Sequence, residues 1–177
     1  MRALNVGVVG ATGMVGKTFM EILTQRKFPV KELRPFASDS SIGKKISFDG
    51  REFECQGLKK GCFKGLDIVF FSSGDDVSAE WAPVAVEDGA WAIDNSNAFR
   101  MKENVPLIVS EVNGELLKKS LKPEIIANPN CTTMQLVVPL KPLQKKFGIS
   151  EVRVSSYQAV SGAGVPGHEE LQSQLSD

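Results

Sequence analysis

The apolar residues of the chain fall into short runs, and the segments between the runs alternate between turn-like and helix-like patterns. Residues 4–9 form the first run, a glycine turn follows, and a helical stretch then leads to a second strand at residues 31–37. One stripe of this helix is expected to be buried, and it consists of Val15, Phe19, Ile22 and Leu23. The order of strand, helix and strand predicts a βαβ unit with a right-handed crossover.

Further short apolar runs predict strands that are covered on both faces of a parallel sheet. These runs lie at residues 68–71, 91–93, 107–109 and 125–127. A helix is expected at residues 78–88, because Gly89 supplies the left-handed residue that closes many helices. The dipeptide Asp49-Gly50, between two alternating stretches, predicts an inserted β-hairpin. The sequence therefore predicts an α/β fold with a Rossmann-like, doubly wound parallel sheet.

The C-terminal part of the chain has a different pattern. A helix is expected after Cys131, a strand at residues 151–157 and the start of another helix at residues 168–175. A lone strand and part of a helix have no sheet of their own on which to pack. We therefore expect a dinucleotide-binding domain at residues 1–127. Residues 128–177 are expected to begin an α+β catalytic and dimerisation domain that is cut short.

Composition narrows the range of partners. The 177 residues include 21 Lys and Arg against 21 Asp and Glu, so the chain has no formal net charge. Such a balance provides no basic surface for nucleic acid, and no apolar run reaches the roughly 18 residues that span a bilayer. A small-molecule substrate is expected instead of nucleic acid or a membrane. The N-terminus lacks the features of a signal peptide, which predicts a cytoplasmic location. The three cysteines suit neither a disulfide scaffold nor a zinc site, and no metal is expected.

The glycine turn is the first candidate binding site. Gly10, Gly13 and Gly16 follow a strand and open a helix, so backbone N–H groups and the helix dipole would face a dinucleotide pyrophosphate. The alternative is a tight structural turn with no ligand. The loop after the second strand would then select the nucleotide. Asp39 there favours the ribose hydroxyl of NAD, whereas a neighbouring group of polar residues favours the 2′-phosphate of NADP. That group consists of Ser38, Ser40, Ser41 and Lys44.

Cys131 is the candidate nucleophile. It follows a buried strand and lies in the first turn of a helix, where the helix dipole stabilises a thiolate and N–H groups can hold an oxyanion. A strand-end cysteine can also be a small buried hydrophobe. Cys55 and Cys62 lack this setting and are interpreted as structural. His168 has no pattern that would orient it toward Cys131, so we interpret it as a surface residue rather than the catalytic base.

Five motifs occur together in order along the chain. They are GATGMVG at residues 10–16, FSSG at 71–74, DNSNAFR at 94–100, NPNCTT at 128–133 and QAVSGAG at 158–164. With these motifs the sequence resembles the aspartate-semialdehyde dehydrogenase family, which is one of the phosphorylating aldehyde dehydrogenases. The resemblance covers the whole chain and implies an NADP-dependent interconversion of aspartyl 4-phosphate and aspartate 4-semialdehyde, a step toward lysine, diaminopimelate, methionine and threonine.

The resemblance also implies roles for individual residues. Cys131 would form a thioacyl intermediate, Gln158 would orient the substrate, and Arg100 and Asn130 would contact its phosphate and carbonyl region. The residues implied in cofactor binding are Gly10, Thr12, Gly13, Met14, Val15, Ser72, Gly74 and Gly162. Family members are typically homodimers, which is the expected assembly of a complete chain.

The sequence departs from the family pattern at several places. Ser40 stands where the family commonly has a phosphate-binding arginine, and Asp75 stands where a second glycine is usual. The choice between NADP and NAD therefore stays open. The family's catalytic histidine and carboxylate-binding arginine lie beyond residue 177, which implies little turnover by this chain alone.

Specific positions disfavour three other enzyme families. An N-acetyl-γ-glutamyl-phosphate reductase usually has glycine before its cysteine and an aromatic residue after it, where Asn130 and Thr132 stand here. The Thr at position 12 disfavours a glyceraldehyde-3-phosphate dehydrogenase. Ser161 stands four residues after Tyr157, where a short-chain reductase would need lysine. A non-catalytic NADP-binding fragment is the alternative from a different class.

Overall fold

The structure is a computed structural model that describes residues 2–119 and 122–176. It divides into two compact units, Met1–Pro139 and Leu140–Asp177. The domain boundary expected between residues 127 and 128 stays a prediction.

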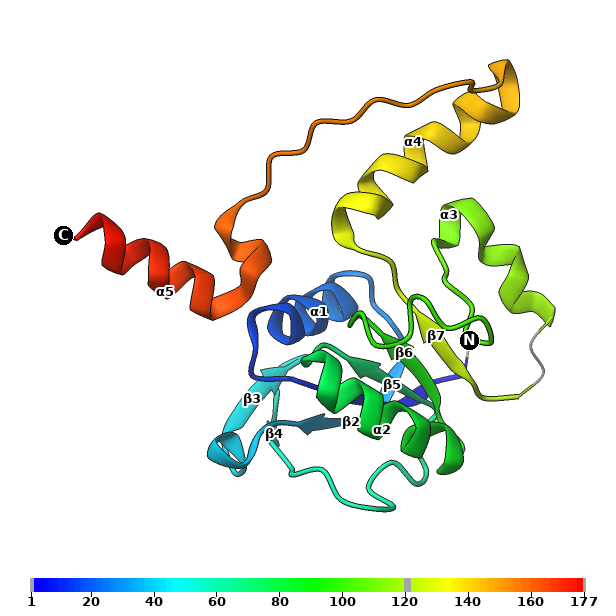
Figure 1. The fold of residues 1–177 in the computed structure, drawn as a ribbon. Helices are drawn as coiled ribbons and strands as arrows, with labels where there is room; N and C mark the ends of the chain where they lie inside the picture. The colour runs from blue at the N-terminus through cyan, green and yellow to red at the C-terminus, as the bar shows by residue number, and fades with distance from the viewer. Residues whose placement is uncertain (1, 120–121, 177) are drawn as a thin grey trace. The chain divides into compact units, whose positions relative to one another are not determined.

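The first unit contains a five-stranded parallel sheet with the strand order β2-β1-β5-β6-β7 (Figure 1). The strands are β1 (Leu4–Val9), β2 (Val30–Phe36), β5 (Ile68–Phe71), β6 (Trp91–Asp94) and β7 (Ile125–Ala127). After β2 the chain returns to the other side of β1, and this reversal makes the sheet doubly wound. The predicted Rossmann-like α/β fold is confirmed.

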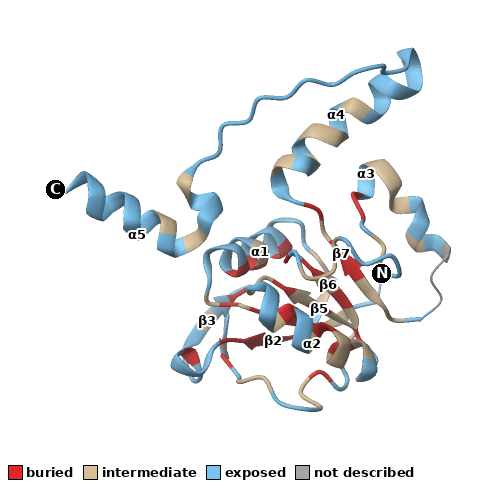
Figure 2. Ribbon diagram, in the orientation of Figure 1, coloured by how far each residue is buried: buried red, intermediate tan, exposed pale blue. Residues whose placement is uncertain are grey.

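Two helices cover opposite faces of this sheet. Helix α1 (Met14–Gln25) packs against the face that carries Val6 and Val8, whereas α2 (Asp75–Glu87) packs against the face that carries Val69 and Phe71. Alternate residues of a strand point to opposite faces, so each central strand contributes to both layers. Figure 2 shows the buried residues concentrated in the strands and on the sheet-facing sides of these helices.

The buried stripe of α1 differs from the expected one. Gly16, Met20 and Leu23 are buried, whereas Val15 and Ile22 are 53% and 39% exposed. Both sets follow helical spacing and lie on adjacent stripes of the helix. The backbone of the glycine turn selects between them, because Gly16 packs directly on Gly10.

The inserted hairpin forms as expected. Strands β3 (Lys45–Phe48) and β4 (Arg51–Glu54) pair antiparallel around Asp49 and Gly50. Both turn residues have positive φ, at 50° and 72°. This geometry is what a two-residue hairpin turn needs and what an Asp-Gly pair tolerates.

The strand expected at residues 107–109 does not form. Leu107 makes a single parallel bridge to Ala127, and the chain then turns into the short helix α3 (Ser110–Asn113) and the 3-10 helix η2 (Gly114–Lys119). The side chain of Asn113 accepts a hydrogen bond from the N–H of Val109 at 2.8 Å. A local side-chain contact thus starts the helix where the apolar run indicated a strand.

Helix α2 begins at Asp75, earlier than the expected start at residue 78, and Gly89 follows its end with a φ of 95°. Helix α4 (Cys131–Phe147) follows β7 and continues beyond Pro139. In the second unit, residues 151–157 pair with no strand among the residues that the structure describes, so the strand expected there is wrong. The 3-10 helix η3 (Val160–Ala163) and helix α5 (Gly164–Leu175) follow.

Candidate functional site

The ends of β1 and β5 meet at the point where the strand order reverses. In open α/β sheets, ligands bind at the carboxyl ends of the strands at such a point. Here the glycine turn follows β1, and Ser72 follows β5. The Ser72 hydroxyl donates to the carbonyl oxygen of Val9 at 2.9 Å, which joins the two strand ends directly.

The glycines of the turn are required by close backbone contacts. A Cβ on Gly10, whose φ is 83°, would lie 2.8 Å from the carbonyl oxygen of Ser72. A Cβ on Gly16 would lie only 2.2 Å from the carbonyl oxygen of Gly10. The turn therefore brings the start of α1 against the sheet edge with no side chain between them. Thr12, Met14 and Val15 lie in this turn and in the first residues of the helix, which are half-buried or exposed.

These residues fit a dinucleotide pyrophosphate. The first N–H groups of a helix have no partner inside it, and at α1 no side chain caps them. Next to the turn, a Cβ on Gly74 would meet no atom within 4 Å. The buried hydroxyl of Ser73 has no hydrogen-bond partner among the described residues. Open space, unpaired donors and an unpaired hydroxyl at one sheet edge are the features that such a ligand would use.

The loop after β2 lies beside the glycine turn. The carbonyl oxygen of Phe36, at the end of β2, accepts the N–H groups of Gly10 and Ala11 at 3.0 and 3.1 Å. The loop then forms the 3-10 helix η1 (Asp39–Ser41). Its polar side chains contact one another: the hydroxyls of Ser38 and Ser40 are 3.2 Å apart, and the Lys44 ammonium donates to the Ser41 hydroxyl at 3.0 Å. The four residues that favour NADP thus form two side-chain pairs in this loop, and Asp39 is exposed in the same loop.

Cys131 is the first residue of α4 and is exposed. Asn130 caps this helix, because its side-chain oxygen accepts the N–H of Thr132 at 2.9 Å and its carbonyl oxygen accepts the N–H of Met134 at 3.0 Å. The side-chain oxygen of Asn130 is therefore occupied by the cap, whereas its amide NH₂ takes no part in capping the helix. Cys131 therefore lies at a helix N-terminus in the structure, as expected.

Arg100 connects the loop after β6 to the loop before Cys131. Its Nε donates to the carbonyl oxygen of Asn128 at 2.8 Å, and its Nη2 donates to that of Asn95 at 3.1 Å. A third bond runs from Nη1 to the side-chain oxygen of Asn97 at 2.5 Å. The sequence motif gave no indication that Arg100 holds these two loops together.

The buried carboxylate of Asp94 shapes the same loop. Asp94 is fully buried at the end of β6 and accepts hydrogen bonds from the N–H and the hydroxyl of Ser96, at 3.2 and 2.7 Å. Its carbonyl oxygen accepts the N–H of Asn128 at 2.7 Å. The motif at residues 94–100 includes Asp94 but gave no indication of this structural role. The available signal was an acid at a strand end, two residues before a serine.

The other two cysteines differ from Cys131 in exposure. Cys55 is buried, and this burial raises the pKa of its thiol, partly opposed by the nearby charge of Lys44. Cys62 is half-buried, and burial raises its thiol pKa as well. Both therefore remain in the unreactive thiol form over a wider pH range than an ordinary cysteine.

Gln158, Gly162 and His168 lie in the second unit. The amide nitrogen of Gln158 would be 2.3 Å from a Cβ at Gly162, so the glutamine side chain packs on the glycine backbone. The structure thus brings Gln158 and Gly162 together. His168 is exposed on α5.

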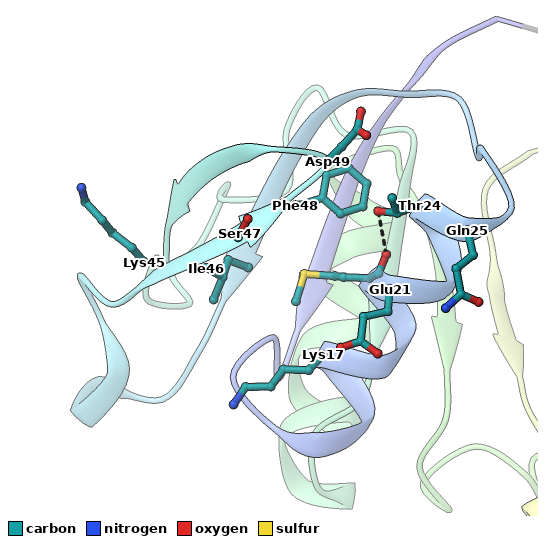
Figure 3. Close-up of a pocket in the computed structure, with 10 residues that line it drawn as sticks. Lys17, Glu21, Thr24, Gln25, Lys45, Ile46, Ser47, Phe48 and Asp49 are labelled. Carbon is teal, nitrogen blue, oxygen red and sulfur yellow. Dashed lines mark hydrogen bonds between the residues drawn. The ribbon is translucent and has the colours of Figure 1, made fainter.

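A hollow of about 560 Å³ lies between α1 and the β3–β4 hairpin (Figure 3). It is lined by both charge signs, for example by Lys17 and Glu21, and its floor includes Phe48. None of the predicted site residues lines it. In the described part of the chain, no helix is both long and apolar enough to span a membrane.

Comparison with known proteins agrees with this geometry. Residues 5–120 match the family model described as the NAD-binding domain of semialdehyde dehydrogenase, and residues 140–177 match its dimerisation domain. The aspartate-semialdehyde dehydrogenase of Aquifex aeolicus is 53% identical over 170 residues, which are 96% of this chain and 50% of that protein.

Solved structures give the same result. A crystal structure of Vibrio cholerae aspartate semialdehyde dehydrogenase II, complexed with ASA, matches with a TM-score of 0.93 and 43% identity over 98% of this chain and 52% of that chain. The Candida albicans enzyme with NADP matches with a TM-score of 0.65 and 30% identity over 83% of this chain and 48% of that one. The chain spans about half the length of the relatives it matches. It contains a Rossmann-like NAD(P)-binding domain, and it belongs to the semialdehyde dehydrogenase family.

Proposed function

We propose that this protein interconverts aspartyl 4-phosphate and aspartate 4-semialdehyde, with Cys131 as the nucleophile. The observation that carries the proposal is the position of Cys131, which is exposed and is the first residue of a helix capped by Asn130. A thiolate is favoured at a helix N-terminus, and the N–H groups there can bind an oxyanion. The names of the relatives supply the substrate class.

In the proposed reaction the Cys131 sulfur attacks the acyl carbon of the substrate. The carbonyl oxygen becomes an oxyanion that N–H groups at the start of α4 stabilise, and the bond between carbon and the phosphate oxygen then breaks. Phosphate leaves, and a thioester joins the acyl group to Cys131. When bound, a nicotinamide dinucleotide would supply a hydride to the thioester carbon; the bond between carbon and sulfur would then break, giving the aldehyde and returning Cys131 as a thiolate.

Substrate and nucleotide would be held by different sets of residues. We assign the phosphate and carbonyl region of the substrate to Arg100 and Asn130, and its orientation to Gln158. The guanidinium fork suits phosphate oxygens, because two parallel N–H groups can bind two oxygens. The nucleotide would bind at the glycine turn and the neighbouring segments. In the first unit these residues are Gly10, Thr12, Gly13, Met14, Val15, Ser38, Ser40, Ser41, Ser72 and Gly74. The family resemblance also assigns nucleotide binding to Gly162, which belongs to the second unit.

NADP is the proposed nucleotide, and NAD is the alternative. The hydroxyl pair Ser38–Ser40 and the pair Lys44–Ser41 in one loop support a 2′-phosphate site, whereas the exposed Asp39 would suit a ribose hydroxyl. The matched dimerisation domain supports a homodimer. The three free cysteines suit a reducing compartment such as the cytoplasm. The proposed reaction would serve the biosynthesis of lysine, diaminopimelate, methionine and threonine.

Release of phosphate in the absence of nucleotide tests the proposed substrate. We expect the protein to release about one equivalent of phosphate from aspartyl 4-phosphate, because the acyl group stays on the thiol. Cys131→Ser should remove this release, whereas Cys62→Ser should retain it. Release from N-acetyl-γ-glutamyl phosphate instead would favour the related reductase. Nucleotide binding without release from either compound would favour a non-catalytic binding module.

A further inference from the structure

The carboxylate of Asp75 makes its hydrogen bonds outside its own helix. Asp75 is the first residue of α2, which follows β5 and Gly74. Its Oδ1 accepts the backbone N–H of Asn97 at 2.7 Å, and its Oδ2 accepts the side-chain amide of Asn97 at 3.5 Å. An exposed acid in the first turn of a helix usually interacts with that helix, so this contact with another loop needs an explanation.

Asn97 also contacts Arg100. The side-chain oxygen of Asn97 accepts a bond from Nη1 of Arg100 at 2.5 Å. Asn97 is therefore fixed at its backbone and amide nitrogen by Asp75 and at its amide oxygen by Arg100. Rotation of the Asn97 amide would place NH₂ against the guanidinium, so the Asp75 contact also selects the amide orientation that Arg100 needs.

Arg100 completes the chain of contacts to residues 128–130, which lead into Cys131 and are called the Cys131 loop below. Its other bonds reach the carbonyl oxygens of Asn95 and Asn128, and the amide of Asn128 donates to the side-chain oxygen of Asn95 at 3.2 Å. These residues follow β6 and β7. The network therefore connects the carboxyl ends of three neighbouring strands, β5, β6 and β7, whose order is shown in Figure 1.

We propose that Asp75 is a positioning residue that, through Asn97, fixes the Arg100 guanidinium for binding phosphate beside the Cys131 loop. The inference rests on the proposed function, in which Arg100 contacts the phosphate of the substrate. A guanidinium has five N–H donors, and among the described residues Nε, Nη1 and Nη2 of Arg100 each use one of theirs. One donor on each terminal nitrogen remains for phosphate. Asp75 fixes the plane in which these two donors lie.

Protection of Cys131 by inorganic phosphate tests this inference. The rate at which iodoacetamide labels Cys131 is measured against phosphate concentration, with mass spectrometry to separate the three cysteine peptides. In the wild-type protein, phosphate is expected to slow the labelling. In Asp75→Ala, the phosphate concentration for half protection should rise about tenfold, the effect of losing one charge-assisted contact. Asp75→Asn keeps an acceptor for the Asn97 N–H but loses the acceptor for the Asn97 side-chain amide, so its half-protection concentration should lie between those of the wild type and Asp75→Ala.

Two controls separate positioning from loss of fold or of helix charge. Asp76→Ala removes the neighbouring acid from the same turn of α2 and should leave phosphate protection unchanged. Slow labelling of the buried Cys55 reports that the fold is intact, and fast labelling of Cys55 in Asp75→Ala would contradict a positioning role. Protection like the wild type in Asp75→Ala, together with its loss in Arg100→Lys, would overturn the inference and leave the proposed function in place. Unchanged protection in Arg100→Lys would contradict the proposed role of Arg100 itself.

Discussion

The guanidinium of Arg100 donates to the backbone carbonyl of Asn128 at 2.8 Å, so the end of β6 is fixed to the end of β7 immediately before Cys131. These bonds to backbone carbonyl oxygens also restrict the conformational freedom of the Arg100 side chain. Arg100 is thus ordered before any ligand binds, and binding a phosphate would require less additional loss of side-chain entropy. The same bonds place the candidate nucleophile and a candidate anion-binding group on one rigid edge of the sheet.

The three cysteines should differ in reactivity. Cys131 is exposed at a helix N-terminus, whereas Cys55 and Cys62 are shielded and burial raises the pKa of both thiols. At neutral pH we expect iodoacetamide to label Cys131 at least about tenfold faster than either of the others. Peptide mass spectrometry over time measures the three rates. Equal rates would contradict the assignment of Cys131 as the activated thiol.

The raised thiol pKa values also predict how stability depends on pH. Between the ordinary pKa of a cysteine and the raised values, the unfolded chain releases these protons more easily than the folded protein does. The free energy of unfolding should therefore fall as the pH rises through this alkaline range. Urea unfolding at several pH values measures the slope. Cys55→Ala should make the slope smaller, and an unchanged slope would argue against a perturbed Cys55.

A methyl group at Gly16 should be poorly tolerated. Its Cβ would lie 2.2 Å from the carbonyl oxygen of Gly10, so the turn or the helix must move. We expect Gly16→Ala to lower the free energy of unfolding by about 2 kcal/mol or more and to weaken nucleotide binding. Gly74→Ala is the matched control, because its Cβ meets no atom within 4 Å, and it should leave stability nearly unchanged. Thermal unfolding of both variants makes the comparison.

Lys44 should contribute to the choice between nucleotides. Its ammonium donates to the Ser41 hydroxyl at 3.0 Å, and Ser38 and Ser40 belong to the same loop. Lys44→Ala is expected to weaken binding of 2′,5′-ADP about tenfold and to leave binding of 5′-AMP nearly unchanged, because only the first compound carries the 2′-phosphate. Isothermal titration gives both affinities.

Lys45 offers the matched control for this change. It follows Lys44 as the first residue of β3, but its ammonium pairs with Glu52 at 2.9 Å. Lys45→Ala should therefore alter neither affinity. If Lys44→Ala affects both compounds equally, Lys44 does not read the 2′-phosphate.

The buried carboxylate of Asp94 should matter for stability. Asp94→Ala leaves the N–H and the hydroxyl of Ser96 without their acceptor, and we expect the free energy of unfolding to fall by about 1–3 kcal/mol. The loss should be smaller in a Ser96→Ala background, since one of the two bonds is already absent there. Urea unfolding of the two single variants and the double variant measures this coupling. Equal losses in both backgrounds would show that the two residues act independently.

The sequence predicted the elements whose patterns are local. The glycine turn and the Asp49-Gly50 hairpin occur as expected, and so do the strands predicted from the apolar runs at residues 4–9, 68–71, 91–93 and 125–127. The run at residues 107–109 failed because Asn113 satisfies the backbone of Val109 and turns the chain. The stripe on α1 was shifted because the contact of Gly16 with Gly10 fixes the rotation of the helix, and this contact has no signal in apolar spacing.

The candidate site was predictable as a set of residues but not as an arrangement. Cys131 and Asn130 could be placed at a helix start from their own neighbours in sequence. The network from Asp75 through Asn97 to Arg100 depends on three loops that meet only in the folded sheet. Periodicity describes one element at a time, so it cannot report a contact among the ends of three strands.

The most direct test is to locate the covalent bond that the proposed reaction forms. The protein is incubated with aspartyl 4-phosphate in the absence of nucleotide, denatured in acid and digested for mass spectrometry. We predict an aspartyl group on the peptide that contains Cys131, in a thioester that hydroxylamine removes. An aspartyl group on Cys55 or Cys62 instead, or an unmodified Cys131 in protein that iodoacetamide still labels there, would contradict the account.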